Sequence, residues 1–373
     1  MTIQRPIWDV EPWDKLPELE GDIEADVCVV GLGGSGLACI LELLRLGQSV
    51  VGMDAGSLAG GAAGRNGGFL IAGTAAFYHD AVAALGRERA KALYSLSLQE
   101  LDRMSAETPD LIRRLGSLRI ATSLEEEADC SRQLAAMQSD GFAVQAYDGP
   151  EGRGLLFPED GAFNPLHRCR RLAELALKGG AELFERTPAQ VVSTHKVTMP
   201  EGSIRCKTVI VAVDGGLETL LPELKGRVRT ARLQMLATAP TNEVSLPRPV
   251  YAHYGYEYWQ QLPGGTVALG GFRDYGGEAE WTHDSKPSER VQGRLESFLR
   301  QEIGVQAPIT HRWAAPVGFT QTGVPIFEEV RDGVWALGGY NGTGNLIGTL
   351  CGRSVAQLLV TGESASAAYL LSG

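Results

Sequence analysis

The sequence predicts an α/β fold, in which a discontinuous Rossmann-like domain carries an inserted antiparallel α+β domain. Residues 24–54 read in order as a strand, a glycine-rich turn, a helix and a second strand. Residues 229–275 instead alternate apolar and polar side chains, a pattern typical of antiparallel strands. A second glycine-rich loop at 338–344 precedes a helical pattern that runs to about residue 360. We therefore expect both ends of the chain in one domain.

The opening motif is G-x-G-x-x-G, spelled by Gly31, Gly33 and Gly36 after the apolar run Ala25–Val30. The first glycine allows a tight turn, the second lets a pyrophosphate approach the backbone, and the third lets helix and strand pack closely. The helix that begins near Ser35 offers unpaired N–H groups and a positive dipole end to an anion. The motif therefore predicts a dinucleotide site.

The second strand of this unit, Ser49–Met53, ends in Asp54. An acid about 20 residues beyond the glycines commonly accepts a hydrogen bond from a ribose hydroxyl. Asp54 is therefore the predicted ribose ligand.

The remaining elements follow from periodicity and turn residues. Helices are predicted at 80–115, 124–137, 165–177, 288–302 and 344–360. Further strands are predicted at 118–122, 190–194, 204–213 and 334–339, and the Pro-Gly-Gly at 263–265 predicts a hairpin turn.

The length of 373 residues favours two domains, since one hydrophobic core rarely grows so large. The predicted nucleotide domain comprises residues 24–90, 155–228 and 312–373. The inserted domain comprises residues 91–154 and 229–311, and residues 1–23 form an extended N-terminal arm.

The composition and charge of the chain limit the kinds of partner that it is expected to bind. A net charge of −11 argues against binding to nucleic acid or to an anionic membrane, and no apolar run has transmembrane length. The acidic start of the chain lacks the pattern of a secretory leader. The six cysteines are scattered without a C-x-x-C pair, and the histidines show no metal spacing. We expect free thiols, no metal and a cytoplasmic protein.

Several segments together resemble the FAD-dependent amino-acid and amine oxidoreductases of the D-amino-acid-oxidase or glycine-oxidase type. They occur in the expected order over most of the chain: ADVCVVGLGGSG near 26–36, GAAGRNGGF at 61–69, DGAFNPLHRCRRLAELALKGGAEL at 160–183, TVIVAVDGG at 208–216, RLQMLATAP at 232–240, YWQQLPGGTVALGGFRD at 258–274 and WALGGYNGTGNLIGTLCGR at 335–353. The GRNGG loop is similar to the branch that oxidises amines such as γ-glutamylputrescine.

The resemblance implies an FAD-binding domain and a substrate domain that roofs the flavin. It places the pyrophosphate at Gly31, Gly33, Gly34, Ser35 and Gly36, and the adenosine ribose at Asp54 and Ala55. The re-entrant flavin loop would contain Gly64, Arg65, Asn66, Gly67 and Gly68. Backbone groups of Val191 or Val192 would meet the adenine, and Val213 and Gly215 are further positions expected to bind the cofactor. The isoalloxazine would lie at Gly339, Tyr340, Asn341, Gly342, Thr343, Gly344 and Asn345.

The second glycine loop also has a physical rationale. Reduced flavin is anionic at N1–C2=O, and a glycine loop that opens a helix places N–H donors and a positive dipole end beside it. The alternative is a plain strand-to-helix turn at 338–344.

For the substrate, Tyr254, Tyr256, Tyr258 and Gln260 are predicted to share one face of a strand at period two. Such aromatic walls favour a cationic or apolar ligand, although alternating tyrosines equally suit a half-buried strand. The other candidate lining residues are Arg273, Arg312 and Tyr340, with Arg232 and Gln234 as further polar positions.

The chain departs from the family at two points. Related oxidases carry an arginine after a tryptophan-glycine stretch that clamps a substrate carboxylate, whereas Trp313–Gly318 contains none. An ordinary α-amino acid is therefore in doubt as the substrate. The frequent G-x-G-H-G has Thr343 for its histidine, and no cysteine stands nearby, so FAD is expected to be non-covalent.

The predicted reaction oxidises a C–N bond by hydride transfer to flavin N5, and the resulting imine hydrolyses. It requires no strong base, so no catalytic residue is assigned. Oxygen or another acceptor would reoxidise the flavin. Two alternatives are an NAD(P)-dependent dehydrogenase, which leaves the second glycine loop unexplained, and a flavin-binding protein without catalysis.

Overall fold

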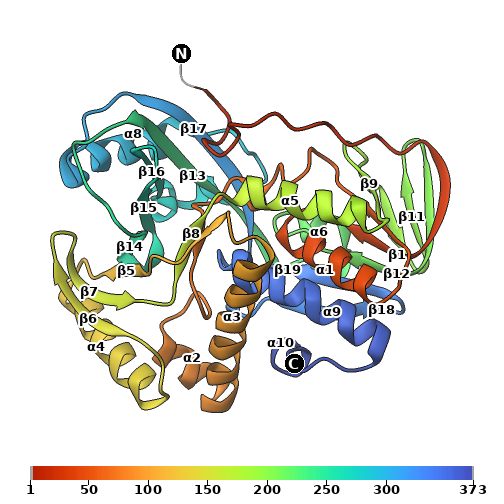
Figure 1. Ribbon diagram of the computed structural model, residues 1–373, viewed down its shortest axis with the longest axis horizontal. Coiled ribbons are helices and arrows are strands. Elements are labelled where there is room, and N and C mark those ends of the chain that lie inside the picture. The colour runs from red at the N-terminus through yellow and green to blue at the C-terminus, as the bar shows by residue number, and fades with distance from the viewer. Residues whose placement is uncertain (1–2, 372–373) are drawn as a thin grey trace. The chain divides into compact units, whose positions relative to one another are not determined.

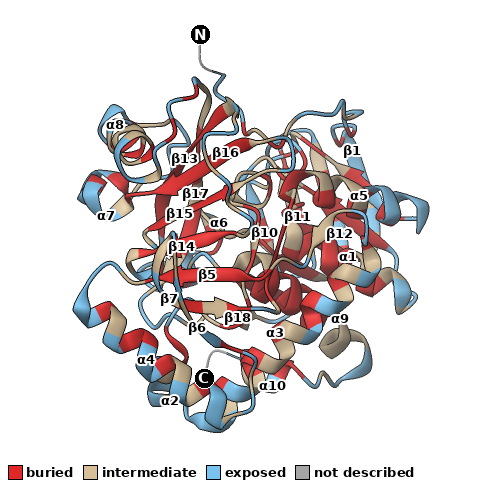
Figure 2. Ribbon diagram, turned by 60° about the vertical axis from the view of Figure 1, so that its left-hand side comes forward, coloured by how far each residue is buried: buried red, intermediate tan, exposed pale blue. Residues whose placement is uncertain are grey.

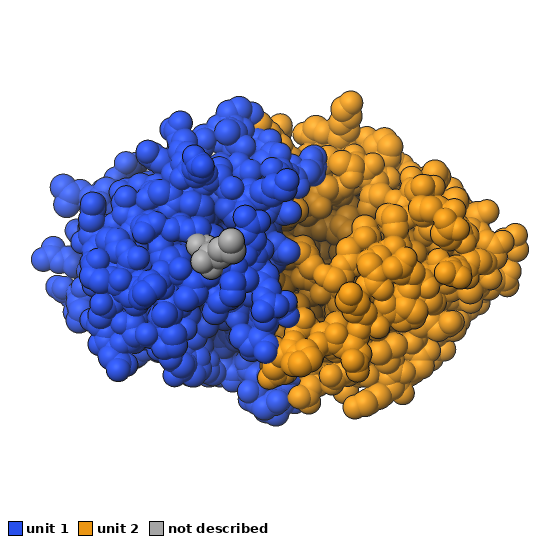
Figure 3. All heavy atoms as spheres, turned by 90° about the horizontal axis from the view of Figure 1, so that it is seen from above, with its two compact units in different colours: residues 1–10, 65–164, 232–315 blue, residues 11–64, 165–231, 316–373 orange. Residues whose placement is uncertain are grey.

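The computed structural model describes residues 3–371, which form two compact units (Figure 3). Unit 1 contains residues 1–10, 65–164 and 232–315, and unit 2 contains residues 11–64, 165–231 and 316–373. The predicted segments change over after residues 23, 90, 154, 228 and 311, whereas the units change over after residues 10, 64, 164, 231 and 315. The assignment of cofactor and substrate domains stays a prediction.

Unit 2 is built around a mixed sheet with the strand order β10-β11-β12-β1-β2-β9, and β19 and β18 continue from β12 (Figure 1). The strands are β1 (Gly21–Val30), β2 (Val50–Met53), β9 (Glu182–Phe184), β10 (Val191–Ser193), β11 (Lys196–Met199), β12 (Gly202–Val211), β18 (Ile326–Arg331) and β19 (Val334–Gly338). Strands β19, β12, β1, β2 and β9 run parallel to one another. This is the predicted Rossmann-like core.

The parallel strands are almost wholly buried where they carry apolar runs, because neighbouring elements cover them (Figure 2). The final four residues of β1 are all buried, and so are all four of β2. The two strands therefore end inside unit 2, where the first glycine motif and Asp54 follow them.

Helix α1 (Gly34–Arg45) packs against α5 (Pro165–Lys178) and α9 (Thr349–Thr361) in unit 2 (Figure 1). A Cβ on Gly352 would overlap the carbonyl oxygen of Ser35, so glycine allows α1 and α9 to approach closely. Shorter helical elements are η1 (Ala62–Gly64), α6 (Leu217–Leu220), η2 (Pro222–Leu224), η6 (Gly344–Gly348) and α10 (Ala367–Leu370).

Unit 1 contributes most of a second sheet with the order β17-β13-β16-β15-β14-β5-β7-β6. Its strands are β5 (Ser117–Ile120), β6 (Gln145–Gly149), β7 (Gly152–Phe157), β13 (Val228–Pro240), β14 (Val250–Ala252), β15 (Glu257–Gln261), β16 (Thr266–Gly271) and β17 (Ile309–Thr320). The predicted antiparallel hairpin at 263–265 joins β15 to β16 and is confirmed. A small sheet contains β3 (Phe69–Leu70), β8 (Gly161–Phe163) and β4 (Ile112–Arg113).

The helical elements of unit 1 are α2 (Tyr78–Leu85), α3 (Arg87–Glu107), α4 (Leu124–Ser139), η3 (His253–Gly255), α7 (Arg273–Gly276), η4 (Gly277–Glu280), α8 (Glu289–Phe298) and η5 (Leu299–Ile303). The helical stretch predicted over 80–115 is confirmed as far as Glu107, but Gly86 has φ 81° and divides it into α2 and α3. Across residues 3–371, no helix combines the length and apolar character that a membrane span requires.

Candidate cofactor and substrate site

The first glycine motif makes the tight turn that its sequence predicts. Gly31 has φ +107°, and a Cβ there would lie 2.6 Å from the carbonyl oxygen of Ala212. A Cβ on Gly36 would overlap the carbonyl oxygen of Gly31. These two glycines are therefore required by the fold of unit 2, whatever ligand it holds.

Gly33 differs from its neighbours because its backbone is extended, with φ −87° and ψ −174°. It is the N-cap of α1, no side chain caps the helix there, and the first turn contains no acid. An added Cβ would meet only the Cβ of Ala63, at 3.2 Å. The open amide end of a 12-residue helix fits a pyrophosphate, whose negative charge the helix dipole favours.

Asp54 lies beside this turn, and its carboxylate supports the loop directly. Oδ2 accepts a hydrogen bond from the amide of Leu32 at 2.9 Å, and Oδ1 accepts one from the amide of Gly56 at 2.8 Å. Burial raises the pKa of Asp54, and the two amide hydrogen bonds oppose that shift. The carboxylate therefore shapes the loop, and its role toward a ribose stays a prediction.

The second glycine motif joins the first within unit 2. The hydroxyl of Tyr340 donates to Oγ of Ser35 at 2.8 Å, in the first turn of α1. The Tyr340 ring packs against Gly344 and Gly348, where an added Cβ would lie 3.1 Å from ring carbons. Tyr340 is only 4% exposed, so it ties the two motifs together. Its role as a lining residue of a substrate cavity stays a prediction.

The loop between β19 and η6 is held in shape by polar side chains of the same unit. Asn341 adopts φ 54°, and its Oδ1 accepts a hydrogen bond from the amide of Thr320 at 2.9 Å. Oγ1 of Thr343 donates to the carbonyl of Tyr340 at 2.7 Å. The loop conformation is therefore fixed by the chain itself.

Asp214 also belongs to this loop system, although it was not predicted as a site residue. Its carboxylate accepts hydrogen bonds from the amides of Tyr340 at 2.9 Å and Gly318 at 3.0 Å. Burial raises its pKa to about 6, while these amides and that of Gly339 act in the opposite direction. Nothing in its Asp-Gly-Gly context distinguishes it from an ordinary turn residue.

Residues 65–68 of the GRNGG loop belong to unit 1, where two tryptophans hold them. Nε1 of Trp313 donates to the carbonyl of Arg65 at 2.7 Å, and Nε1 of Trp8 donates to the carbonyl of Asn66 at 2.8 Å. Oδ1 of Asn66 accepts from the amide of Gly68 at 2.8 Å. Trp8 therefore anchors the N-terminal arm to this loop.

Tyr258 and Gln260 lie beside this loop, on the same face of β15. A Cβ on Gly67 would lie 3.1 Å from the Tyr258 ring, and Nε2 of Gln260 donates to the carbonyl of Gly67. Burial raises the pKa of Tyr258 above its usual range, so its hydroxyl stays protonated at neutral pH. Tyr258 can donate a hydrogen bond there but cannot act as a base.

The prediction that Tyr254 and Tyr256 share this strand face is wrong. Residues His253–Gly255 form a 3₁₀ turn in which Tyr254 has φ 55°, and β15 begins only at Glu257. Tyr254 is 42% exposed. The alternating tyrosines mimic a strand in the sequence, but the chain turns between β14 and β15.

The arginine candidates are engaged elsewhere in unit 1. The guanidinium carbon of Arg273 lies 5.3 Å from the ring centroid of Tyr256 and 4.8 Å from that of Trp281. Arg312 donates to Oε1 of Gln292 at 2.9 Å and pairs with Glu296. It lines an exposed groove of about 480 Å³ together with Lys286, Ser288, Glu289 and Gly293.

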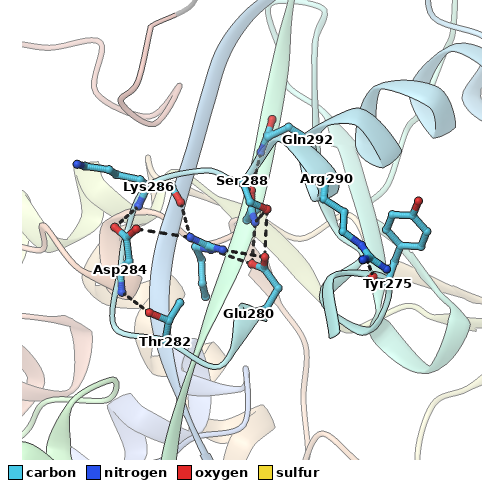
Figure 4. Close-up of polar contacts among 10 residues, drawn as sticks. Tyr275, Glu280, Thr282, Asp284, Lys286, Ser288, Arg290 and Gln292 are labelled. Atoms are coloured by element: carbon cyan, nitrogen blue, oxygen red, sulfur yellow. Dashed lines mark hydrogen bonds and ion pairs between the residues drawn. The ribbon is translucent and has the colours of Figure 1, made fainter. Parts of the chain in front are cut away.

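Arg232 and Gln234 form part of a polar network around Glu280. Figure 4 labels Glu280 and its neighbour Ser288 in this network. Arg232 binds Glu280 through two hydrogen bonds of 2.8 Å, and Gln234 donates to the same carboxylate at 2.7 Å. This network fastens the segment after η4 to β13, and it leaves neither side chain available as a carboxylate clamp.

The remaining predicted cofactor positions also fall in unit 2. Val191 and Val192 lie on β10 at the edge of the sheet, and Gly64 ends η1. A Cβ on Gly31 would lie 2.9 Å from Cγ1 of Val213, and a Cβ on Gly215 would lie 2.7 Å from the carbonyl oxygen of Pro316. Their contacts with FAD stay predictions.

Comparisons with known proteins agree with this geometry. The family model for DAO, described as FAD dependent oxidoreductase, matches residues 26–358. A probable oxidoreductase OrdL from Rhizobium meliloti is 26% identical, over an alignment that covers 96% of this chain and 90% of the relative. Gamma-glutamylputrescine oxidoreductase from Escherichia coli is 28% identical and covers 93% of this chain and 86% of its own. The crystal structure of glycine oxidase from Geobacillus kaustophilus superposes with a TM-score of 0.76 at 21% identity, covering 94% and 98% of the two chains.

Proposed function

Because this chain belongs to the DAO family of FAD-dependent oxidoreductases, we propose that it oxidises the C–N bond of a small amine or amino acid. The observation that carries this proposal is the link between two glycine motifs in unit 2. Ser35 at the first motif and Tyr340 at the second share a buried hydrogen bond of 2.8 Å. An NAD(P) site would require only the first motif.

FAD, when bound, supplies the acceptor for the hydride that leaves the carbon next to nitrogen. The same oxidation removes a proton from nitrogen and leaves an imine, which water hydrolyses to a carbonyl compound and a free amine. The chain's own contribution is to bind and orient the reactants, because correct placement of a C–H bond supplies much of the rate acceleration.

Particular residues are proposed for these tasks. Gly33, Gly34 and Ser35 at the start of α1 would hold the pyrophosphate, since their helix end lacks a side-chain cap. Tyr258 would present a protonated hydroxyl toward the substrate, because burial keeps its pKa high. Gln260 would hold the GRNGG loop through the carbonyl of Gly67.

Substrate identity, the electron acceptor and location are finer proposals. The similarity to gamma-glutamylputrescine oxidoreductase, whose name gives an amine as its substrate, supports an amine substrate here. Oxygen or another acceptor would complete the cycle. Six buried cysteines without disulfides support a reducing compartment, the cytoplasm.

The test is anaerobic titration of the purified protein with a panel of amines and amino acids. The expected result is a yellow protein whose flavin absorption bleaches with at least one of them. A yellow protein that no amine bleaches would favour the non-catalytic alternative. A colourless protein that binds a nicotinamide cofactor would instead reverse the choice of cofactor.

A further inference from the structure

We propose that Arg119 of β5 is an anion-binding residue, whose buried guanidinium takes a carboxylate group in a small cavity of unit 1. Three observations support the proposal. Arg119 has no carboxylate partner, the nearby acids already accept hydrogen bonds from other groups, and Arg119 lines a cavity. None of them depends on the candidate lining residues of the sequence analysis.

Arg119 is a buried cation without a counter-ion. Arg119 is only 7% exposed, and its Nη1 donates a hydrogen bond to Oε1 of Gln133 at 2.7 Å. Nε is buried with no hydrogen-bond partner. Within residues 3–371, no carboxylate forms an ion pair with Arg119. An ionised group taken out of water without a partner is costly, and buried charges are therefore normally paired.

The surroundings compensate only part of that cost. The guanidinium carbon lies 4.0 Å from the centroid of the Phe77 ring and 5.1 Å from that of Tyr251. Ring faces attract a cation, but each such contact is weaker than a buried hydrogen-bonded carboxylate. The aromatic contacts fix the plane of the guanidinium and leave its Nε edge unsatisfied.

The buried acids of the region, Glu126, Asp129 and Asp160, are already engaged. Asp129 pairs with His79 and Arg132. Glu126 accepts from the amides of Thr122 at 2.9 Å and Tyr254 at 2.7 Å. Asp160 accepts from the amide of Ala72 at 3.1 Å and from Oγ of Ser117 at 2.6 Å. Each carboxylate therefore serves its own loop, and an anion for Arg119 has to come from outside the chain.

Arg119 lines a cavity of about 20 Å³ that could receive this anion. Its walls include the segment Ile71–Thr74 and the side chains of Gln133 and Tyr251. A single water needs about 10–15 Å³ on this measure, so the space is of the size of a halide or of the end of a carboxylate. The planar fork of arginine matches a carboxylate best.

The position suggests where the carboxylate comes from, and this step rests on the proposed function. Ile71 directly follows the GRNGG loop and β3 in the chain. The family's usual clamp arginine is absent from Trp313–Gly318. Arg119 would therefore hold a carboxylate of the amine substrate, or else a free carboxylate that stabilises unit 1.

The first experiment measures the melting temperature of the flavin-loaded protein against acetate concentration, at constant ionic strength held with sulfate. Acetate should raise the melting temperature of the wild type in a saturable manner and leave that of Arg119→Met unchanged. Arg114→Gln is the matched control: it removes the same charge from the neighbouring segment, where Arg114 pairs with Asp102 at 2.7 Å, and should respond as the wild type does.

Three outcomes would overturn the carboxylate site: no response of the wild type, an equal response of Arg119→Met, or chloride acting as strongly as acetate. If Arg119→Met does not fold, Arg119→Lys takes its place. Lysine keeps the charge but loses the planar fork, so its apparent acetate affinity should fall about tenfold.

The second experiment identifies the source of the carboxylate by comparing amines of equal length with and without a terminal carboxylate, such as 4-aminobutanoate and butylamine. A substrate clamp predicts that Arg119→Met raises KM at least tenfold for the carboxylated amine and leaves KM for the plain amine unchanged. Equal KM values in wild type and variant, with the acetate response intact, would assign the site to a free carboxylate and overturn the clamp. Failure of every amine to bleach the wild-type flavin contradicts the proposed function, while the acetate experiment still tests Arg119.

Discussion

Among the residues of the first glycine motif, Gly33 separates a requirement of the fold from a requirement of the cofactor. Gly31 and Gly36 are surrounded by backbone, whereas Gly33 has an ordinary φ and only the Cβ of Ala63 near its missing side chain. The sequence motif alone treats the three glycines as equivalent. Their different surroundings become visible only when β12 and η1 are in place around the turn.

We predict that Gly33→Val folds but purifies without flavin, because the side chain would occupy the approach of the pyrophosphate. The absorbance ratio at 450 and 280 nm measures flavin content, and circular dichroism measures the fold. Gly61→Val is the control, since Gly61 has no atom within 4 Å of an added Cβ, and it should retain flavin. Wild-type flavin content in Gly33→Val would contradict this assignment.

The buried carboxyl group of Asp160 leads us to predict how the stability of the protein depends on pH. Burial raises its pKa to about 7, above the ordinary value of 3.8, although hydrogen bonds from Ser117 and Ala72 act in the opposite direction. The folded state therefore keeps a proton that the unfolded state releases, and this contribution to stability is lost as pH rises from about 4 to about 7. The melting temperature of Asp160→Asn relative to the wild type should therefore rise between pH 4 and pH 7 and stay level above that range. A constant difference across that range would show that Asp160 does not titrate there.

At the scale of elements, local pattern predicts structure where one residue decides the turn. The order β1, α1, β2 follows from an apolar run, three glycines and a second apolar run, and the hairpin between β15 and β16 follows from Pro-Gly-Gly. The turn at His253–Gly255 could not be predicted from local pattern in this way. Its tyrosines have strand periodicity, and only tertiary contacts, such as the hydrogen bond from the Tyr254 amide to Glu126, favour the strained turn.

Helix α4 offers a quantitative test at this scale. Oγ of Ser123 accepts from the amide of Glu126 at 3.1 Å, and the Glu126 carboxylate accepts from the amide of Thr122 at 2.9 Å. Ser123→Ala should lower the free energy of unfolding by about 1 kcal/mol, since it leaves a helix amide without its cap. Ser131→Ala, on the same helix, removes only a hydrogen bond to the Glu127 carbonyl and should change stability little. Urea unfolding would show both values, and equal effects would count against the capping role.

At the scale of the whole molecule, the sequence predicts the cofactor better than the substrate. Cofactor loops carry glycines whose spacing is local, so a motif reveals them, and the family comparison agrees. The polar residues that unit 1 buries are set by long-range contacts. Arg119 sits in an ordinary strand pattern, Ser-Leu-Arg-Ile, and only the packed structure shows that its charge is buried without a carboxylate.

The most direct test of the central proposal, oxidation of a C–N bond at bound FAD, is the rate of flavin bleaching by an amine that carries deuterium on the carbon next to nitrogen. Measured anaerobically by stopped flow, the bleaching rate should fall several-fold relative to the protiated amine, because the C–H bond breaks as the flavin is reduced. A protein that holds no flavin, or whose flavin no amine or amino acid reduces, would contradict the proposal.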